Sequence, residues 1–169
     1  DRPLRGARRE EGVMLALRRG LRVALLAGSD THASRPGGSA KEPCGYWGGL
    51  CAVWADALTR RGLFEAFRAR RTYALTRARI GLMFMVNGAC MGSEIPFARE
   101  VRLAMEVWAP GPIERIDLLK NTRPWKSVRP DRDETWIEEE DRIDAPAFYH
   151  VRVTLKDGNL AVSTPVWVG

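Results

Sequence analysis

The sequence predicts an α/β part followed by an all-β part, with the boundary between residues 78 and 79. Two observations lead to this order. The first half alternates helical patterns with an apolar run, whereas the second half alternates apolar and polar residues with a period of two. With 45% hydrophobic and 28% charged residues, the 169-residue chain has the composition of an ordinary globular protein.

The first part, residues 1–78, is predicted to hold helices and buried strands in alternation. Residues 10–19 carry apolar side chains at helical spacing. Residues 21–27 are almost entirely apolar, as in a strand that is buried on both faces. A glycine-rich loop and a short strand follow, and Thr59 suits the N-cap of a second helix. A helix followed by a buried strand is half of a parallel α/β repeat.

The second part, residues 79–169, is predicted to form a compact β-sandwich. Apolar residues alternate along 80–86, and Asn87-Gly88 is a strong signal for a two-residue hairpin turn. Asp157-Gly158 predicts a second hairpin. We expect the acidic stretch 131–141 to form a solvated loop or an edge.

The formal net charge of +6 is spread unevenly, with basic runs at 1–22 and 59–79. This asymmetry is compatible with an anionic substrate or a nucleic acid. The lack of a lysine-rich tract and of a basic strand with interleaved aromatic residues argues against nucleic acid. No run approaches the roughly 18 apolar residues of a membrane span. Three cysteines without CxxC spacing argue against a disulfide framework or a zinc ribbon.

No secretory signal is visible, which favours a cytoplasmic location. Because the sequence starts at Asp1 rather than at a methionine, we expect that a native N-terminal segment is absent.

The candidate chemistry lies just after the apolar run, where Asp30 and His32 follow Gly28-Ser29. In extended backbone, residues i and i+2 face the same side, so the carboxylate and the imidazole can converge. A hard oxygen ligand beside a neutral nitrogen ligand suits a hydrolytic metal centre. The alternative is a turn in which Asp30 caps local backbone amides and His32 is incidental.

The chain contains only one further histidine, His150, on the polar face of its expected strand, which indicates a structural or exposed role. Two histidines cannot furnish a histidine-rich multinuclear centre. If Asp30 and His32 are ligands, we expect the others in a missing N-terminal half or in another subunit.

Several blocks occur together in a recognisable order: Gly28 to Gly37, Gly48 to Ala55, the helix and Arg-Thr-Tyr-Ala strand over 63–74, Val86-Asn87-Gly88, and the ending over 149–168. This order resembles the polymerase and histidinol phosphatase (PHP) superfamily, in particular its CehA/McbA-type metallohydrolases and a related uncharacterised family.

The resemblance implies that residues 1–78 are the C-terminal strands and helices of a PHP-type α/β barrel, packed on the β-sandwich. It implies two or three divalent metals, such as zinc, manganese or iron, with Asp30 and His32 as ligands. In the intact protein, metal-activated water would hydrolyse a small anionic or ester substrate, with a phosphoester preferred to a carbamate or carbonyl ester. Arg35 would neutralise the anionic group, and Tyr73 would donate to the substrate. The alternative is a non-catalytic β-sandwich binding or interaction module with a vestigial metal site.

Overall fold

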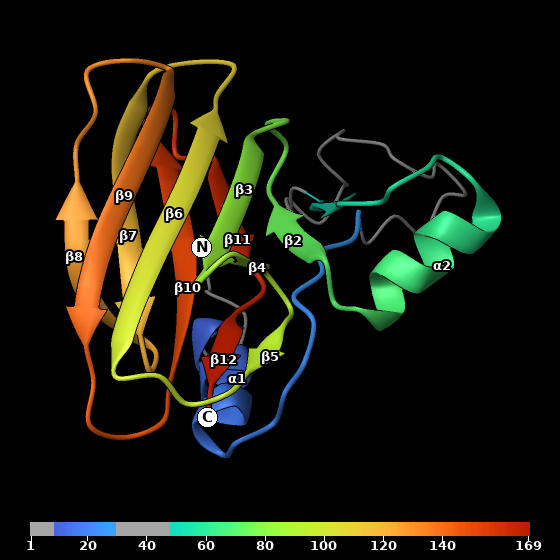
Figure 1. Ribbon diagram of the computed structural model, residues 1–169. Helices are drawn as coiled ribbons and strands as arrows, with labels where there is room; N and C mark the ends of the chain where they lie inside the picture. Colours follow the sequence, from blue (N-terminus) through green and yellow to red (C-terminus); the bar gives the residue numbers. More distant parts are fainter. Residues whose placement is uncertain (1–8, 30–47) are drawn as a thin grey trace.

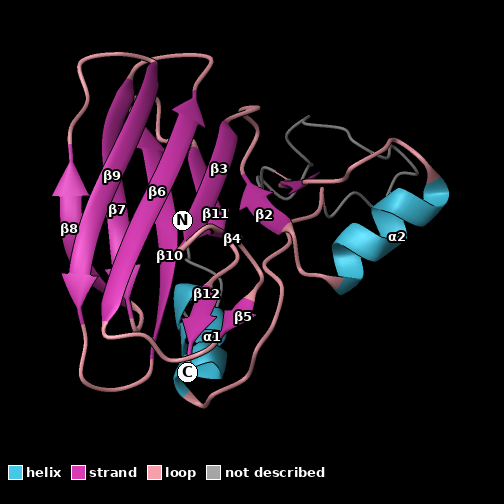
Figure 2. Ribbon diagram, in the orientation of Figure 1, coloured by secondary structure: helices cyan, strands magenta, loops and turns pink. Residues whose placement is uncertain are grey.

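The computed structural model describes residues 9–29 and 48–169, and these residues form two packed β-sheets with two short helices beside them (Figure 1). The helices are α1 (Arg9–Arg18) and α2 (Arg60–Arg68). Figure 2 shows how strands dominate the described chain, with α1 against the sandwich and α2 projecting to one side. The architecture of the described residues is therefore a β-sandwich.

The larger sheet, here called sheet A, contains β1 (Leu50–Val53), β2 (Thr72–Leu75), β5 (Glu94–Ile95), β7 (Ile113–Lys120), β8 (Arg123–Val128), β10 (Ala147–Leu155), β11 (Leu160–Ser163) and β12 (Val166–Val168). Its strand order is β1-β2-β11-β10-β12-β5, and β7 pairs with the other side of β10 and carries β8. Both β11 and β12 pair with β10, along different parts of this long strand.

The smaller sheet, sheet B, has the order β4-β3-β6-β9, with β3 (Gly81–Val86), β4 (Ala89–Cys90), β6 (Glu100–Trp108) and β9 (Glu134–Arg142). All paired strands of the described residues run antiparallel, except that β12 and β5 are parallel. Alternation with a period of two places one side of each central strand in the core. Phe84, Met105 and Tyr149 are fully buried there.

Local turn and cap signals are confirmed. Asn87 and Gly88 both have positive φ, at 49° and 79°, as a type I′ turn requires between β3 and β4. Gly158 has φ 84° in the turn between β10 and β11. The Thr59 side chain accepts a hydrogen bond from the backbone N–H of Gly62 at 3.0 Å, so it caps α2 as predicted.

The prediction of a PHP-type α/β barrel is wrong for the described residues. Residues 21–27 form no strand, and Leu21 and Leu26 are more than half exposed. Strands β1 and β2 pair antiparallel with each other, and β2 continues into sheet A through β11. The apolar run had suggested a parallel α/β repeat, but a short apolar run alone does not distinguish a buried strand from other apolar segments. The β-sandwich component of the prediction agrees with the structure.

The predicted domain boundary at 78/79 stays a prediction. Strands β1 and β2 come from before this position and β11 from after it, yet all three belong to sheet A.

Strand β9, which holds most of the acidic stretch, forms one edge of sheet B. Its side chains alternate, so that Glu138 and Glu140 are exposed on the outer face. Asp141 instead reaches across to sheet A, where the Lys120 ammonium lies 2.7 Å away and the Tyr149 hydroxyl donates at 2.6 Å. A second inter-sheet ion pair joins Lys126 to Glu139. Charged pairs therefore close this side of the sandwich.

Helix α1 lies on the outer face of sheet A (Figure 1). Leu17 is only 1% exposed and faces Phe148 and Trp167, which are paired residues on β10 and β12. One apolar side of the helix thus covers part of the outer face of sheet A. From the alternation along the strands alone, this face would be expected to contact water.

Candidate functional site

Three of the four predicted site residues, Asp30, His32 and Arg35, lie outside the described residues. Their predicted metal and substrate contacts stay predictions. The fourth, Tyr73, lies on β2 and is 6% exposed. Its hydroxyl donates to the Ile80 carbonyl at 3.1 Å and accepts from the Leu82 N–H at 3.3 Å.

The hydroxyl of Tyr73 thus joins sheet A to the start of β3, and burial raises its pKa. This geometry supports a structural role in the sandwich and gives no support to the predicted donation to a substrate.

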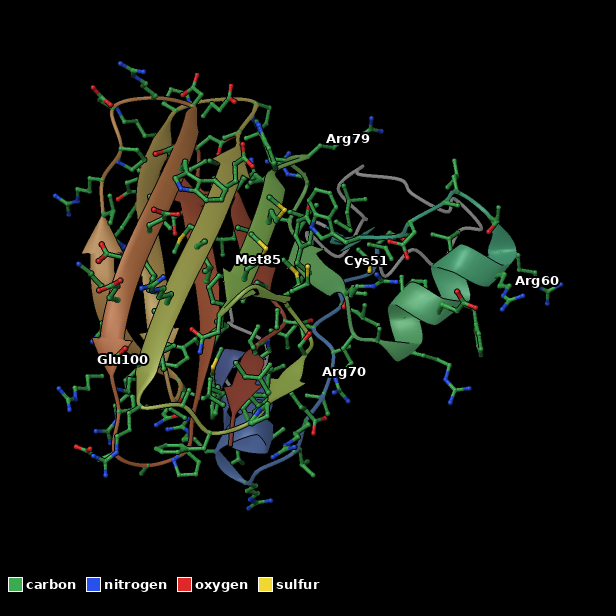
Figure 3. The ribbon with its side chains drawn as sticks, in the orientation of Figure 1. Cys51, Arg60, Arg70, Arg79, Met85 and Glu100 are labelled. Atoms are coloured by element: carbon green, nitrogen blue, oxygen red, sulfur yellow. The ribbon has the colours of Figure 1, made fainter. Side chains whose placement is uncertain are left out.

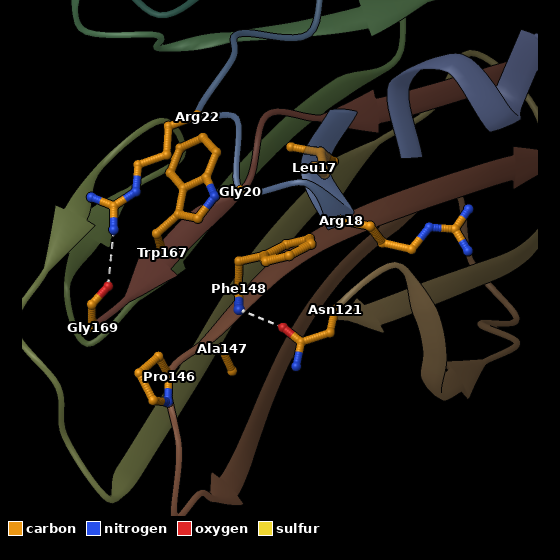
Figure 4. Close-up of a pocket in the computed structure, with 10 residues that line it drawn as sticks. All are labelled: Leu17, Arg18, Gly20, Arg22, Asn121, Pro146, Ala147, Phe148, Trp167 and Gly169. Carbon is orange, nitrogen blue, oxygen red and sulfur yellow. Dashed lines mark hydrogen bonds between the residues drawn. The ribbon is translucent and has the colours of Figure 1, made fainter. Parts of the chain in front are cut away.

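Several polar side chains lie near the end of α1. An open pocket of about 360 Å³ lies between the end of α1 and strands β10 and β12, and Figure 4 draws the residues that line it. The rings of Phe148 and Trp167 form its walls. Asn121 accepts a hydrogen bond from the Phe148 N–H at 3.0 Å, and Arg22 donates to the Gly169 carbonyl at 3.1 Å. The polar groups of this pocket are thus largely engaged with neighbouring parts of the chain.

Asp117 forms the centre of an ionic cluster on the outer face of sheet A. It is 1% exposed and lies between Arg152 on β10 and Ser127 on β8 in the strand register. Arg152 Nη2 donates at 2.9 Å, the Ser127 hydroxyl at 2.6 Å, and Arg115 Nε lies 3.0 Å from Oδ1. Burial acts to raise the pKa of Asp117, but the bonds from Ser127 and Arg152 outweigh it and lower the pKa.

His150 occupies the next outward position on β10, opposite Leu119. It is 0% exposed, and its ring stacks on Phe148 with centroids 6.2 Å apart and an interplanar angle of 18°. Neither Nδ1 nor Nε2 has a hydrogen-bond partner in the structure as described. Burial, with a smaller effect of Arg152, lowers the pKa of His150 from 6.5 to about 4.

A cavity of about 150 Å³ adjoins His150 beneath α1. Arg152 and Thr122 also line it, and four apolar residues complete the wall: Met14, Leu119, Pro124 and Val162. The sequence pattern correctly predicts that His150 shares a face with Arg152. It misses the burial of His150 because nothing in the strand pattern reveals that α1 covers this face.

Helix α2 presents a different kind of surface. Only Ala66 of this helix is buried, whereas Phe64 is 60% and Phe67 42% exposed. Leu63 lies with these two rings along a shallow groove bordered by Arg60 and Arg61. Leu58, just before the helix, is also almost completely exposed.

Residues 9–29 and 48–169 contain no group of three or more His, Cys, Asp or Glu side chains placed to hold a metal ion. Within the same residues, no helix is long and apolar enough to span a membrane. Among the described residues, two surfaces stand out: the region between α1 and sheet A, where the buried His150 has no hydrogen-bond partner, and the exposed apolar side of α2.

The fold and these surfaces define a β-sandwich domain with an appended amphipathic helix. In comparisons with known proteins, residues 23–105 match the model of a family described as "Protein of unknown function (DUF3604)". The matched segment runs from the apolar stretch through α2 and into β6.

Two uncharacterised proteins are similar over 94% of this chain, one from Chlamydia muridarum at 31% identity and one from Chlamydia trachomatis at 30%. The chain spans 29% of the length of these relatives. Among solved structures, fibronectin(III)-like modules of Clostridium thermocellum CbhA match 51% of this chain and 94% of their own, with 14% identity and a TM-score of 0.37.

These matches correct the expected family. The resemblance to the PHP superfamily is wrong, because the family model that matches has no assigned function and the similar proteins are uncharacterised. What stands is a β-sandwich domain of unknown function.

Proposed function

We propose that this chain is an interaction module that docks onto another part of a longer polypeptide through the apolar side of α2. The observation that carries this proposal is the exposure of Phe64 and Phe67 on a helix that buries only Ala66. Large apolar side chains grouped on a projecting element are typical of a surface that another protein surface covers.

Residues 21–27, which lie between α1 and β1 in the sequence, support the same proposal. Leu21 and Leu26 are 53% and 54% exposed, although they belong to an almost continuously apolar run. Leu25 is anchored to the sheet, since its N–H donates to the Thr164 hydroxyl and its carbonyl accepts from Thr72. The segment is thus held in place at the buried Leu25, while the side chains of Leu21 and Leu26 remain open for a further contact.

The length of the relatives supports our choice of partner, which is another part of the same longer polypeptide. This chain corresponds to 29% of each of two Chlamydia proteins, so most of each relative lies outside the matched region. A surface on that remaining polypeptide would bury the α2 rings. Three arginines and one glutamate on α2 make the helix basic, so we expect the opposing surface to be apolar with an acidic rim. In Figure 3, Arg60 marks the end of α2 that lies farthest from the sandwich.

The test measures binding between this chain and the rest of the longer polypeptide, produced as two separate proteins. We expect Phe64→Ser and Phe67→Ser each to weaken the complex by about tenfold or more, because burying a phenylalanine is worth about 1.5–3 kcal/mol. Phe97→Ser is the matched control, since Phe97 is 44% exposed in the segment between β5 and β6. Binding that is equally sensitive to all three variants would contradict the proposal.

For Asp30 and His32 we keep a second proposal, that the intact protein uses them to bind a divalent metal for hydrolysis. Their i, i+2 spacing after Gly28-Ser29 supports it. We expect the longest form of the protein to hold at least one metal per chain by elemental mass spectrometry, and the Asp30→Ala/His32→Ala variant to lose most of it. A metal-replete parent without bound metal would overturn this second proposal.

A further inference from the structure

We propose that the cavity beneath α1 binds a small organic carboxylate, with His150 and Arg152 as the groups that recognise it. The cavity lies on the outer face of sheet A, whereas the proposed docking helix α2 follows β1 at the edge of that sheet. The carboxylate site is therefore independent of the docking surface, and either proposal can fail alone.

The first argument is the unsatisfied imidazole. His150 is fully buried, and neither ring nitrogen has a hydrogen-bond partner within the described parts of the chain. Buried polar side chains in folded proteins normally have a partner, and leaving one unpaired costs about 1–3 kcal/mol. His150 is one of the residues that line the cavity, so a molecule bound there is placed to supply that partner.

The second argument is the local charge. Arg152 donates to Asp117 through Nε and Nη2, and these bonds leave Nη1 as the guanidinium nitrogen that Asp117 does not engage. Arg115 also pairs with Asp117, so two guanidinium groups face one carboxylate and the cluster carries a net positive charge. The cavity lining contains Arg152 and no acidic residue. A negatively charged ligand is favoured over a neutral or cationic one.

The third argument is the size and polarity of the cavity. Its volume of about 150 Å³ equals that of about five water molecules, each taking about 30 Å³ in the liquid. Met14, Leu119, Pro124 and Val162 make most of its wall apolar, while Thr122, His150 and Arg152 are its polar lining residues. A carboxylate head with a short apolar tail would use both kinds of lining, whereas inorganic phosphate would leave the apolar wall unused.

Nuclear magnetic resonance of the histidine side chains tests this site with sodium butyrate as the probe. The chain has two histidines, so in metal-free protein His32 serves as an internal reference for His150. We expect butyrate to shift the His150 ring signals saturably and to raise the pKa of His150 by about one unit or more, because a nearby anion stabilises the charged imidazolium. Butyramide, which has a similar shape without the charge, should bind at least about tenfold more weakly.

Two variants keep the proposal falsifiable. His150→Leu removes the imidazole, and Met14→Trp fills the cavity while leaving both recognition groups in place. We expect each folded variant to bind butyrate at least about tenfold more weakly than the parent chain. The proposal is overturned if butyramide or inorganic phosphate binds as well as butyrate, if Met14→Trp leaves binding unchanged, or if His32 and His150 shift in parallel.

Discussion

The free energy of unfolding should fall by about 3 kcal/mol between pH 7 and pH 4 because of His150 alone. Burial, with a smaller effect of Arg152, lowers the pKa of this imidazole from 6.5 to about 4 in the folded chain. His150 therefore becomes protonated near pH 6.5 in the unfolded chain, but only near pH 4 in the folded chain. Well above pH 6.5 the imidazole is neutral in both states and costs no stability. As the pH falls from about 6.5 to about 4, the unfolded chain is increasingly favoured and the free energy of unfolding decreases.

Urea unfolding at several pH values in a buffer free of carboxylates measures this effect, with His150→Leu as the comparison. The variant should lack the loss of about 2 kcal/mol that the parent shows between pH 7 and pH 5. That range separates His150 from Asp117 and Asp141, since carboxyl groups with lowered pKa values cost stability only at lower pH. Parallel pH profiles for the two proteins would show that His150 titrates normally.

Asp117→Ala should destabilise the chain by about 3 kcal/mol. Asp117 is 1% exposed, and its removal leaves the half-buried guanidinium groups of Arg115 and Arg152 without their carboxylate. The Ser127 hydroxyl also loses its acceptor. Breaking one side of a buried ion pair is costly because the remaining charge stays partly desolvated.

Chemical denaturation of three variants tests the role of Asp117. Glu138→Ala is the matched control, because Glu138 is an exposed carboxylate on a strand of the same fold and should change stability by less than about 0.5 kcal/mol. Asp117→Leu combined with Arg152→Met replaces the main pair by apolar side chains and should recover part of the loss. Equal effects of Asp117→Ala and Glu138→Ala would contradict a central role for the cluster.

Local sequence signals predicted the β part of the fold well. The Asn87-Gly88 and Asp157-Gly158 turns and the Thr59 cap depend on residues close together in the chain, and the structure confirms them. Such features are set by backbone conformation and by side-chain bonds to nearby amides. The acidic stretch, expected as a loop or an edge, contains the edge strand β9.

The errors concern contacts between distant parts of the chain. Residues 21–27 have the composition of a buried strand, but the structure leaves Leu21 and Leu26 exposed and without strand pairing. The position of His150 on the outer face of β10 follows from alternation, whereas its burial depends on α1, which lies more than a hundred residues earlier. Alternation within one strand carries no information on which distant element will cover it.

The charges along β9 have a consequence for the behaviour of the protein at high concentration. An edge strand offers unpaired backbone groups to which a strand of another molecule can add. Here the exposed face carries Glu138 and Glu140, of which Glu140 also pairs with Arg102 of β6 at 3.3 Å, while Glu139 and Asp141 are held by lysines of the opposite sheet. A second copy arriving in register would place carboxylates against carboxylates. We therefore expect this edge to resist growth into fibrils at neutral pH and to resist it less after acidification.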